Sequence, residues 1–386
     1  MQLQPEFTPY FTRLISDFEK HHPNVRISWV DIPWDAMESK ILSSVASNTA
    51  PDVVNLNPNF ASLLAGRGAW LNLNYNLSSA EIDQYLPKVW QANSLDKIAF
   101  GFPWYLTTEI IFYNQEILHQ AGLSTPPVNY QQLAHAARLI KEKTGKYAFF
   151  VTFLSGDSAQ ALESLVQMNV KLFDEKGRAA FNSPEGIAAF KYWVDLYKEG
   201  LLPPEVLTQG HREAIDLYQS GQLAMLSAGS EFFKSILTNA PNIAKVTKFA
   251  SQITGKSGKR GVDVMNLVIP RDSHQVDLAT EFALYITNTQ NQLEFAKAAS
   301  VLPSTVDGID IYLKELSIND VNNDRLLQAR AISAKQLKEA QVLIEPRKNL
   351  NQLQKIIYDN LQAAMLGDKS VETALKDAAE QWNALL

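Results

Sequence analysis

Cysteine is absent from the 386 residues of this chain. Its absence excludes disulfides, thiol nucleophiles and thiolate metal sites, although it does not indicate a compartment. No stretch approaches ~18 uninterrupted apolar residues, so the sequence predicts no membrane-spanning helix. Lysine and arginine form no run, since the one local basic cluster, at Lys256, Lys259 and Arg260, is interrupted by glycines. With a net charge of −6, a nucleic-acid partner is not expected.

Catalytic motifs are also scarce. The six histidines form no H-E-x-x-H pair, and His21 and His22 lie at a polar helix end, so the sequence predicts neither a metal site nor a cofactor. A G-x-S-x-G nucleophile motif is missing. The segment ASQITGKS resembles a phosphate-binding loop, but Ala250 stands in place of its first glycine. A basic surface loop is the favoured interpretation of that segment.

The length and composition are those of an ordinary globular protein with more than one core. Hydrophobic residues make up 46% of the chain and charged residues 20%. Single cores stop growing near ~250–300 residues, so a chain of this length is expected to form two domains.

The most informative stretch for predicting the fold and the site runs from Ile98 to Asn114, IAFGFPWYLTTEIIFYN. Its apolar ends predict two strands, and Pro103 predicts a strand end or edge, because proline donates no ladder hydrogen bond. The adjacent aromatics Trp104 and Tyr105 are then expected at a strand end, where α/β proteins place ligand sites. The alternative is that both aromatics are plain core.

Helical and strand patterns alternate through most of the chain, which favours α/β layers with mainly parallel sheets. Thr8 is expected to cap a first helix with Pro9 at its first position, and the alternation in VRISWV (25–30) predicts the first strand. Capping signals at Ser78 with Glu81 and at Ser183 with Pro184 predict two further helix starts. From 325 onward the chain is expected to be helical over 325–340 and 350–386.

Polar residues just past the predicted strands are the candidate binding groups. Asn57 and Asn59 follow the strand VVNL, although caps and turns are the commoner use of such asparagines. Glu109 and Glu231 also lie at strand ends. An acid pair of the glycosidase type is one interpretation of these two carboxylates.

Several segments together resemble the carbohydrate-type extracellular solute-binding proteins of ABC importers. The segments are DFEKHHPNVRISWVDIPWDAMESKI, TAPDVVNLN, FGFPWYLTTEIIFYN, AAFNSPEGIAAFKYWVDLYKEGLLPPE, LAMLSAG, VMNLVIPRDS and ATEFALYITNTQNQLEFAKAASVLPS. Each is weak alone, but they cover nearly the whole chain in the order of that family.

The resemblance implies a two-lobed α/β fold of the periplasmic binding protein type II kind, each lobe a mainly parallel sheet flanked by helices. Lobe 1 is expected to comprise residues 1–109 and 265–305, and lobe 2 residues 110–264 and 306–386. The ligand is held in a cleft between the lobes, which close on it by a hinge.

The resemblance also implies where the ligand contacts lie. A sugar has an apolar face for stacking on aromatics and a rim of hydroxyls that need polar partners. The expected ligand-binding residues are Trp104, Tyr105, Asn57, Asn59, Glu109, Ser230, Glu231, Met265 and Asn266, with His211 and Arg347 as weaker candidates. Where many relatives carry a Gly-Gly-Trp-like segment, this chain has Val264, Met265 and Asn266.

The function that the resemblance implies is capture of a sugar or polyol and its delivery to a membrane permease, by a monomer without enzymatic activity. The implied location is periplasmic or extracytoplasmic. A glycerol-phosphate-type ligand is the second possibility, and an enzyme acting on glycosides through Glu109 and Glu231 is the third.

The N-terminal region departs from the family pattern. Relatives carry an export signal and then a strand before the first helix, whereas only seven residues precede Thr8 and MQLQPEF has no signal-peptide character. We expect that the sequence starts inside the mature protein and that the first strand of lobe 1 is missing from it.

Overall fold

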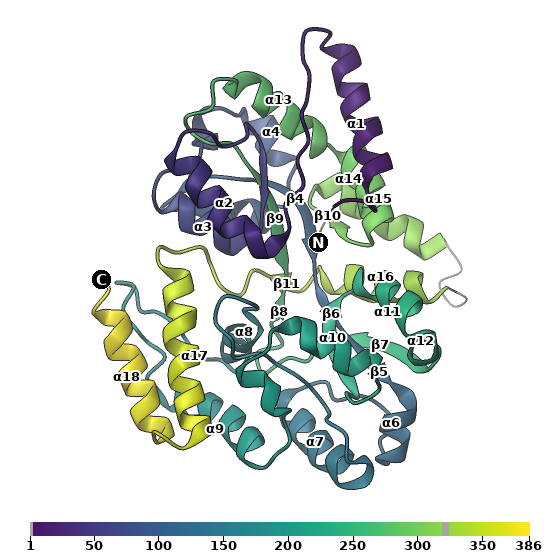
Figure 1. The fold of residues 1–386 in the computed structure, drawn as a ribbon, viewed down its shortest axis with the longest axis vertical. Helices are drawn as coiled ribbons and strands as arrows, with labels where there is room; N and C mark the ends of the chain where they lie inside the picture. The colour runs from purple at the N-terminus through teal and green to yellow at the C-terminus, as the bar shows by residue number, and fades with distance from the viewer. Residues whose placement is uncertain (1–2, 319–323) are drawn as a thin grey trace. The chain divides into compact units, whose positions relative to one another are not determined.

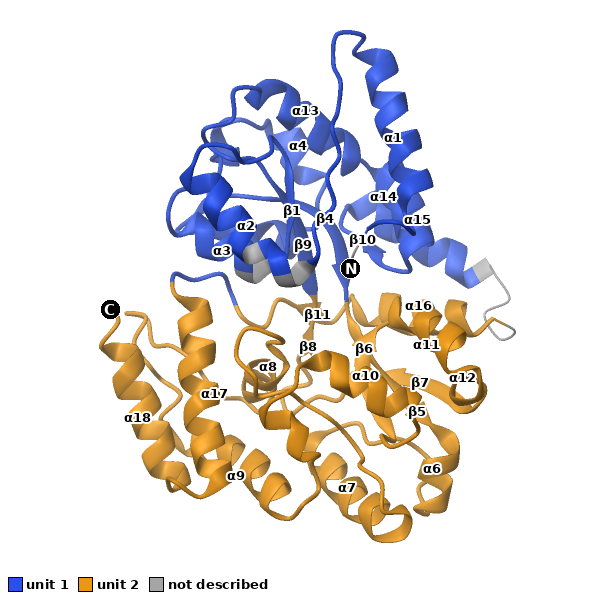
Figure 2. Cartoon of the chain, in the orientation of Figure 1, with its two compact units in different colours: residues 1–107, 263–323, 345–348 blue, residues 108–262, 324–344, 349–386 orange. Residues whose placement is uncertain are grey.

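The computed structural model describes residues 3–318 and 324–386 (Figure 1). The chain forms two compact units, coloured separately in Figure 2. Unit 1 comprises residues 1–107, 263–323 and 345–348, and unit 2 comprises 108–262, 324–344 and 349–386. The chain changes unit within two residues of the two predicted crossings. Helix α15 (Val306–Ile318) belongs to unit 1, whereas the predicted lobe 1 ended at residue 305.

Unit 1 is built on a four-stranded sheet in the order β1-β9-β4-β10, and every ladder in it is antiparallel. Its strands, with the small β2–β3 hairpin, are β1 (Val54–Leu56), β2 (Ser94–Leu95), β3 (Ile98–Ala99), β4 (Phe102–Thr107), β9 (Asp263–Val268) and β10 (Leu302–Pro303). Its other helices are α1 (Thr8–His21), α2 (Trp34–Ala46), α3 (Pro58–Ala65), α4 (Ser79–Asp83), α5 (Pro87–Gln91), α13 (Val276–Ile286) and α14 (Thr289–Ala299).

Unit 2 is built on a three-stranded antiparallel sheet in the order β6-β5-β7. A separate two-stranded sheet pairs β8 and β11 in parallel. The strands are β5 (Glu109–Asn114), β6 (Met225–Gly229), β7 (Thr247–Ser251), β8 (Arg260–Gly261) and β11 (Ala340–Gln341). The helices are α6 (Gln115–Gln120), α7 (Tyr130–Thr144), α8 (Gln160–Gln167), α9 (Pro184–Lys198), α10 (His211–Gln219), α11 (Phe232–Asn239), α12 (Pro241–Val246), α16 (Arg325–Gln336), α17 (Leu350–Leu366) and α18 (Val371–Asn383).

The mixture of helices and strands agrees with the predicted α/β class, but the ladders do not agree with mainly parallel sheets. Among the described residues, parallel pairing is confined to β8–β11 and to single bridges such as Tyr147–Leu223. In unit 2, for example, β5 lies between β6 and β7, and both run antiparallel to it.

Local capping signals set several helix starts. Ser78 and Glu81 form the predicted capping box, and the Ser183 side chain accepts from the Gly186 N–H at the start of α9. The prediction for Thr8 is wrong, because α1 begins at Thr8 and its cap position is Phe7, which makes no side-chain cap. The predicted helix over 350–386 is broken in two at Gly367, whose φ of 88° ends α17.

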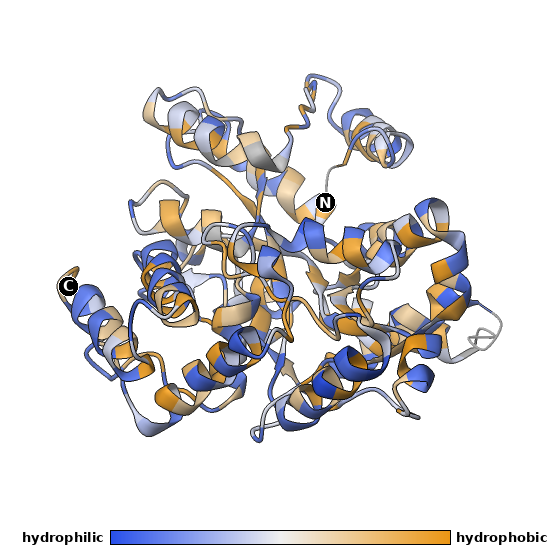
Figure 3. Ribbon diagram, turned by 60° about the horizontal axis from the view of Figure 1, so that its bottom comes forward, coloured by the Kyte–Doolittle hydropathy of each residue, from blue (hydrophilic) through white to orange (hydrophobic). Residues whose placement is uncertain are grey.

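Each unit has its own apolar core. Figure 3 shows polar and apolar residues alternating around the helices, as expected for helices that bury one face. In unit 2, Phe112 of β5 and Trp193 of α9 are fully buried in one large cluster. In unit 1, Leu56 of β1 and Val268 of β9 are fully buried in a smaller apolar cluster. None of the described helices is long and apolar enough to cross a membrane.

Candidate functional site

Glu109, the first residue of β5, is the best-defined polar group at a strand end of unit 2. Its carboxylate Oε1 accepts a hydrogen bond from Gln160 Nε2 at 2.8 Å, and Oε2 accepts one from Ser227 Oγ at 2.7 Å. The ladder places Glu109 opposite Gly229, so its side chain shares a face with Ser227, two residues earlier on β6. Glu109 is half-buried, and both of its oxygens are held by neighbours.

A second carboxyl group lies beside the same glycine. A Cβ added to Gly229 would lie 2.2 Å from Glu231 Oε2, so the Glu231 side chain folds back over the end of β6. Glu109 is the strand partner of that glycine. The structure therefore brings the two predicted carboxylates to one end of the β5–β6 ladder. Ser230, between Gly229 and Glu231, is 2% exposed.

A small polar cavity adjoins Glu109. It has a volume of about 20 Å³ and is lined by side chains that include Glu109, Tyr130, Gln160, Glu163 and Gln167. A cavity needs roughly 10–15 Å³ to hold a water molecule, so this one admits about one water and no sugar ring. The side chains that line this cavity help to orient Glu109, but the cavity is too small to bind a sugar.

Tyr130 is the titratable neighbour of this cavity. Burial raises its pKa well above the ordinary tyrosine value, and the nearby Tyr192, Glu109 and Glu163 raise it further. Tyr130 therefore stays protonated at neutral pH and donates to Gln167 Oε1. The hydrogen-bond donors to Glu109 itself, Gln160 and Ser227, are likewise neutral.

The predicted strand-end asparagines of unit 1 have different surroundings. Asn57 caps α3, since its Oδ1 accepts from the Phe60 N–H at 2.9 Å. This contact matches the capping alternative. The side chain of Asn59 lies outside the described residues. A ligand role for either residue stays a prediction.

Met265 and Asn266 lie inside β9 and are buried. Asn266 is fully buried; its Nδ2 donates to Val264 O at 3.1 Å, and its Oδ1 has no partner among the described residues. Met265 is 9% exposed and pairs with Tyr105 of β4. Neither side chain presents a free polar surface in unit 1.

Trp104 and Tyr105 are packed in the core of unit 1, which favours the core alternative for both. Trp104 is 1% exposed and stacks on Phe295 of α14, with ring centroids 4.7 Å apart and planes inclined by 21°. Tyr105 is 3% exposed and contacts the same ring at 5.4 Å. Sequence neighbours on a regular strand would point to opposite faces.

The reason for this packing is a β-bulge. Strand β4 includes Pro103, and its pairing with β9 shifts register between Pro103 and Tyr105. The prediction that Pro103 lies at a strand end or edge is therefore wrong. Pro103 lies within β4, between β9 and β10 in the sheet, and it adjoins the bulge, an irregularity at which proline is tolerated. Its carbonyl accepts from Ser304 Oγ at 2.7 Å and from Gln292 Nε2 at 3.2 Å.

The weaker candidates, His211 and Arg347, lie in different units. His211 begins α10 of unit 2, where its backbone N–H donates to Asp157 Oδ2 at 2.7 Å. Its ring approaches Phe232 edge-on at 6.0 Å. Arg347 is half-buried in the short stretch 345–348 of unit 1.

Two contributors to the Glu109 cluster were not predicted. Ser227 lies within the quoted strand LSAG, and its place two residues before Gly229 was a usable signal. Gln160 opens α8, and nothing in the local sequence distinguishes it from a surface glutamine. Among the residues that the structure describes, no three histidine or acidic side chains are grouped to hold a metal ion.

Comparison with known proteins places this geometry in context. A family profile described as bacterial extracellular solute-binding protein matches residues 4–293. Crystal structures of a proposed oligosaccharide periplasmic-binding protein from Synechococcus sp. MITs9220, with and without zinc, are 44% identical to this chain. The zinc complex superposes with a TM-score of 0.95 over 100% of this chain and 97% of that one.

More distant relatives have the same fold or family. The GacH receptor of Streptomyces glaucescens, solved unliganded and with acarbose, is 21% identical with a TM-score of 0.79 over 99% of this chain and 96% of that one. A mannitol-binding protein of Pseudomonas aeruginosa is 25% identical over 72% of this chain and 65% of its own length. The predicted two-lobed binding-protein fold is thereby confirmed.

Proposed function

This chain belongs to the bacterial extracellular solute-binding proteins, and from that membership we propose that it captures a sugar or sugar-like polyol and delivers it to the permease of an ABC importer. Proteins of this family bind a solute and release it unchanged, so the chain is a binding protein and not an enzyme. The proposed place of action is outside the cytoplasmic membrane, as for the family. The protein is proposed to act as a monomer.

The observation that carries the proposal is the whole-chain similarity to the proposed oligosaccharide periplasmic-binding protein of Synechococcus, at 44% identity. Relatives of lower identity include the mannitol-binding protein and an arabinooligosaccharide-binding protein of Bacillus subtilis. Their named ligands share a rim of hydroxyl groups. Polyhydroxyl compounds are therefore the proposed ligand class.

Glu109 is the proposed anchor for ligand hydroxyls in unit 2. A carboxylate accepts several hydrogen bonds, and the two that Glu109 already accepts leave lone pairs for a hydroxyl donor. Gln160 and Ser227 fix its rotamer, so little side-chain entropy is lost on binding. Ser230 and Glu231, at the same ladder end, are proposed to contribute further contacts.

For unit 1, the proposed contact is Asn57, which directly follows β1. Tyr105, Met265 and Asn266 are weaker members of the proposed set, because they are buried inside β4 and β9. A ligand bound by groups of both lobes has higher affinity for a closed arrangement, which is the proposed basis of hinge closure. Trp104 is the weakest member of the predicted set, because its ring is covered by Phe295.

The glycerol-phosphate alternative has less support. A phosphate is best held by arginine or by an open helix N-terminus. The N-terminus of α10 is already occupied, since Asp157 accepts from the His211 N–H and lies against Gly210. A second anion there would meet the Asp157 carboxylate. Arg347 is the remaining candidate for this ligand.

A thermal-shift and calorimetry panel tests the proposal. The panel contains mannitol, maltose, an arabino-oligosaccharide and glycerol 3-phosphate, with sodium sulfate as the ionic control. A ligand at ~100 times its dissociation constant adds about 2.7 kcal/mol to the unfolding free energy, which is a clear rise in melting temperature. Binding of glycerol 3-phosphate without any sugar or polyol would overturn the proposal in favour of the phosphate ligand.

A further inference from the structure

Gln336, the last residue of α16, is buried in unit 2, and its amide makes three hydrogen bonds. Its Nε2 donates to the Glu109 carbonyl at 3.0 Å and to Thr108 Oγ1 at 3.2 Å. Its Oε1 accepts from the Gln252 N–H at 2.7 Å. An amide is a neutral side-chain group that donates and accepts at once, so a glutamine suits a buried position that has to do both.

The partners of Gln336 lie at the unit 2 ends of the two crossings. Thr108 is the first residue of unit 2 after the first crossing. The Oε1 of Gln252 accepts from the Gly261 N–H at 2.8 Å, and Val262 is the last residue of unit 2 before the second crossing. All of these residues belong to unit 2. We call Thr108, Gln252 and Gln336 the clasp, because their contacts join the two crossings within that unit.

Neighbouring groups fix the clasp from both sides. Ser333 lies three residues before Gln336, on the same side of α16. Thr108 Oγ1 donates to the Ser333 carbonyl at 3.0 Å and lies 2.9 Å from its hydroxyl. Beyond α16, strand β11 pairs with β8, and the Gln341 carbonyl accepts from the Val262 N–H at 3.1 Å. Buried polar networks whose groups are hydrogen-bonded are rigid, so the clasp restricts the backbone at both crossings.

The clasp holds the backbone that carries the proposed ligand anchor. Gln160 and Ser227 hold the carboxylate of Glu109, whereas Gln336 holds its carbonyl group. A binding group has to lie within about 0.5 Å of its productive position, because hydrogen bonds weaken steeply as their geometry worsens. Movement of the Glu109 backbone would move the carboxylate with it. The strength of a ligand contact at Glu109 therefore depends on the clasp as well.

We propose that Gln336 is a positioning residue for ligand binding. Its amide holds Glu109 at the start of β5 and ties that point, through Gln252, to the second crossing. Gln336 acts through Glu109 and does not itself contact the ligand. This inference rests on the proposed function, because it takes Glu109 as the anchor for ligand hydroxyls.

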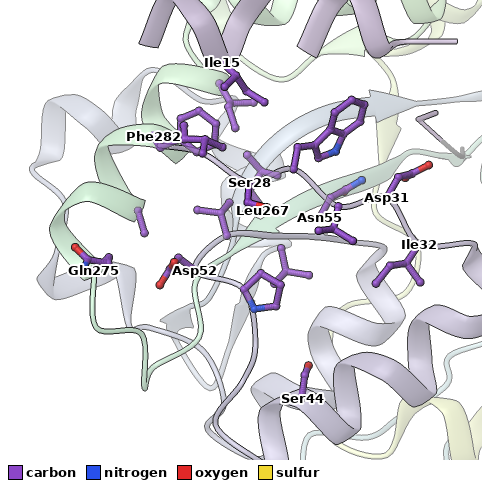
Figure 4. A pocket seen from close by; sticks show the side chains of 18 of the residues that line it. Ile15, Ser28, Asp31, Ile32, Ser44, Asp52, Asn55, Leu267, Gln275 and Phe282 are labelled. Carbon is purple, nitrogen blue, oxygen red and sulfur yellow. The ribbon is translucent and has the colours of Figure 1, made fainter. Parts of the chain in front are cut away.

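A larger cavity, in unit 1, is the alternative place for a small ligand. It has a volume of about 1200 Å³, and its lining includes Ile15, Leu267 and Phe282 (Figure 4). A polyhydroxyl ligand needs several convergent polar groups, whereas this lining is mainly apolar. A ligand held there would depend on neither Glu109 nor Gln336, so variants of these two residues distinguish the two places.

The first test measures amide hydrogen exchange by NMR and needs no ligand. Gln336→Met keeps the length of the side chain but removes the amide, so the Gln252 N–H loses its acceptor. We expect the amides of Gln252 and Gly261 to exchange roughly tenfold faster than in the parent. Gln131→Met, at an exposed position of α7, is the matched control and should leave both rates unchanged. Unchanged exchange at Gln252 in Gln336→Met would overturn the proposal.

The second test measures sugar affinity by calorimetry, at a temperature at which melting curves show every variant to be folded. Gln336→Met should weaken binding by roughly 3–30-fold in the parent, but by less than about twofold when Glu109→Ala is already present. Gln336→Asn has the same amide on a side chain one methylene shorter, so it should show the same pattern, and it replaces the Met variant if that one does not fold. An equal loss with and without Glu109→Ala would show that Gln336 does not act through Glu109, and it would overturn the proposal. A lower melting temperature with unchanged affinity would overturn it too, since Gln336 would then contribute to stability alone.

The two tests separate this proposal from the proposed function. A parent that binds no sugar or polyol would overturn the proposed function, while faster exchange in Gln336→Met would still support the clasp. A parent that binds a sugar with an affinity unchanged by Glu109→Ala would bind it elsewhere, for example in the cavity of unit 1. That result would overturn the positioning role of Gln336 and leave sugar capture in place.

Discussion

The indole ring of Trp104 lies stacked on the phenyl ring of Phe295, with centroids 4.7 Å apart. Phe11 meets the same indole edge-on at 5.9 Å, so aromatic rings enclose it from helices α1 and α14. A ring covered in this way contributes to the hydrophobic core. Trp104, which the sequence favours as the ligand platform, is thus packed in the core of unit 1, and its platform role stays a prediction.

Replacing Trp104 with Ala is therefore expected to lower the unfolding free energy by about 3–5 kcal/mol, the usual cost of removing a buried tryptophan. Trp104→Phe keeps an aromatic ring against Phe295 but removes the unpartnered indole N–H and part of the ring volume, so we expect it to cost less than Trp104→Ala. Denaturant titration measures both. A Trp104→Phe protein of normal stability that binds its sugar tenfold more weakly would restore the platform role.

Local features of unit 1 and unit 2 were predictable, and pairings between distant segments were not. The Ser78 capping box and the Ser183 cap depend on residues three apart, so the sequence displays them directly. The role of Pro103 depends on β9 and β10, which are about 160 and 200 residues away along the chain, and its bulge has no local signature.

The same contrast holds for the candidate site. Glu109 and Glu231 were predicted at strand ends, and the register of β5 with β6 brings both to Gly229. Gln160 was missed because its contact with Glu109 joins residues 51 positions apart through tertiary packing. The alternation in residues 25–30 did predict an extended segment, but a ladder also needs a partner strand, and the described chain supplies none.

Asn57 allows the capping and ligand roles to be separated. Asn57→Ala removes the acceptor for the Phe60 N–H and is expected to cost about 0.5–2 kcal/mol of stability. Asn57→Asp keeps a capping oxygen, so its stability should be near that of the parent. Thermal melts with and without the bound sugar make the comparison. If Asn57→Asp keeps its stability but loses sugar affinity, the side chain also contacts the ligand.

Glu109→Gln tests the proposed anchor in unit 2. The amide keeps the shape of the side chain but removes the charge that strengthens hydrogen bonds from hydroxyl donors. We expect sugar affinity to fall by about 10–100-fold, equivalent to the ~1.5–3 kcal/mol of a hydrogen bond to a charged group. Calorimetric titration measures this, with the exposed Glu142→Gln as the matched control. Equal sugar affinity in the two variants would show that Glu109 does not contribute to sugar binding.

Buried tyrosines make the stability sensitive to alkaline pH. Burial raises the pKa of Tyr218, whose hydroxyl bonds to Thr247, and also raises the pKa of Tyr85 and Tyr358. In each case the folded pKa lies above the unfolded value of about 10, so the unfolded state loses its protons first as pH rises. The stabilising contribution is complete below ~pH 9 and is lost progressively above the unfolded pKa.

We therefore expect the unfolding free energy to fall steadily between ~pH 9 and ~pH 12, as measured by urea titration at fixed ionic strength. Tyr218→Phe removes one titrating group and should make this fall less steep. A slope that is the same in Tyr218→Phe and the parent would show that Tyr218 does not contribute to the alkaline loss.

Ligand binding is expected to compact the protein. The chain divides into two units with separate cores, and lobes joined by a few crossing segments usually move relative to each other in solution. A sugar that is bound by groups of both lobes has more contacts in a closed arrangement, and it shifts the population toward that arrangement by its difference in affinity. Small-angle scattering with and without a saturating sugar should then show a smaller radius of gyration in the bound state. Glu109→Gln at the same sugar concentration serves as the control, because weakened binding should leave its radius unchanged. A radius that stays constant in the parent at proven saturation would show that the sugar binds without hinge closure.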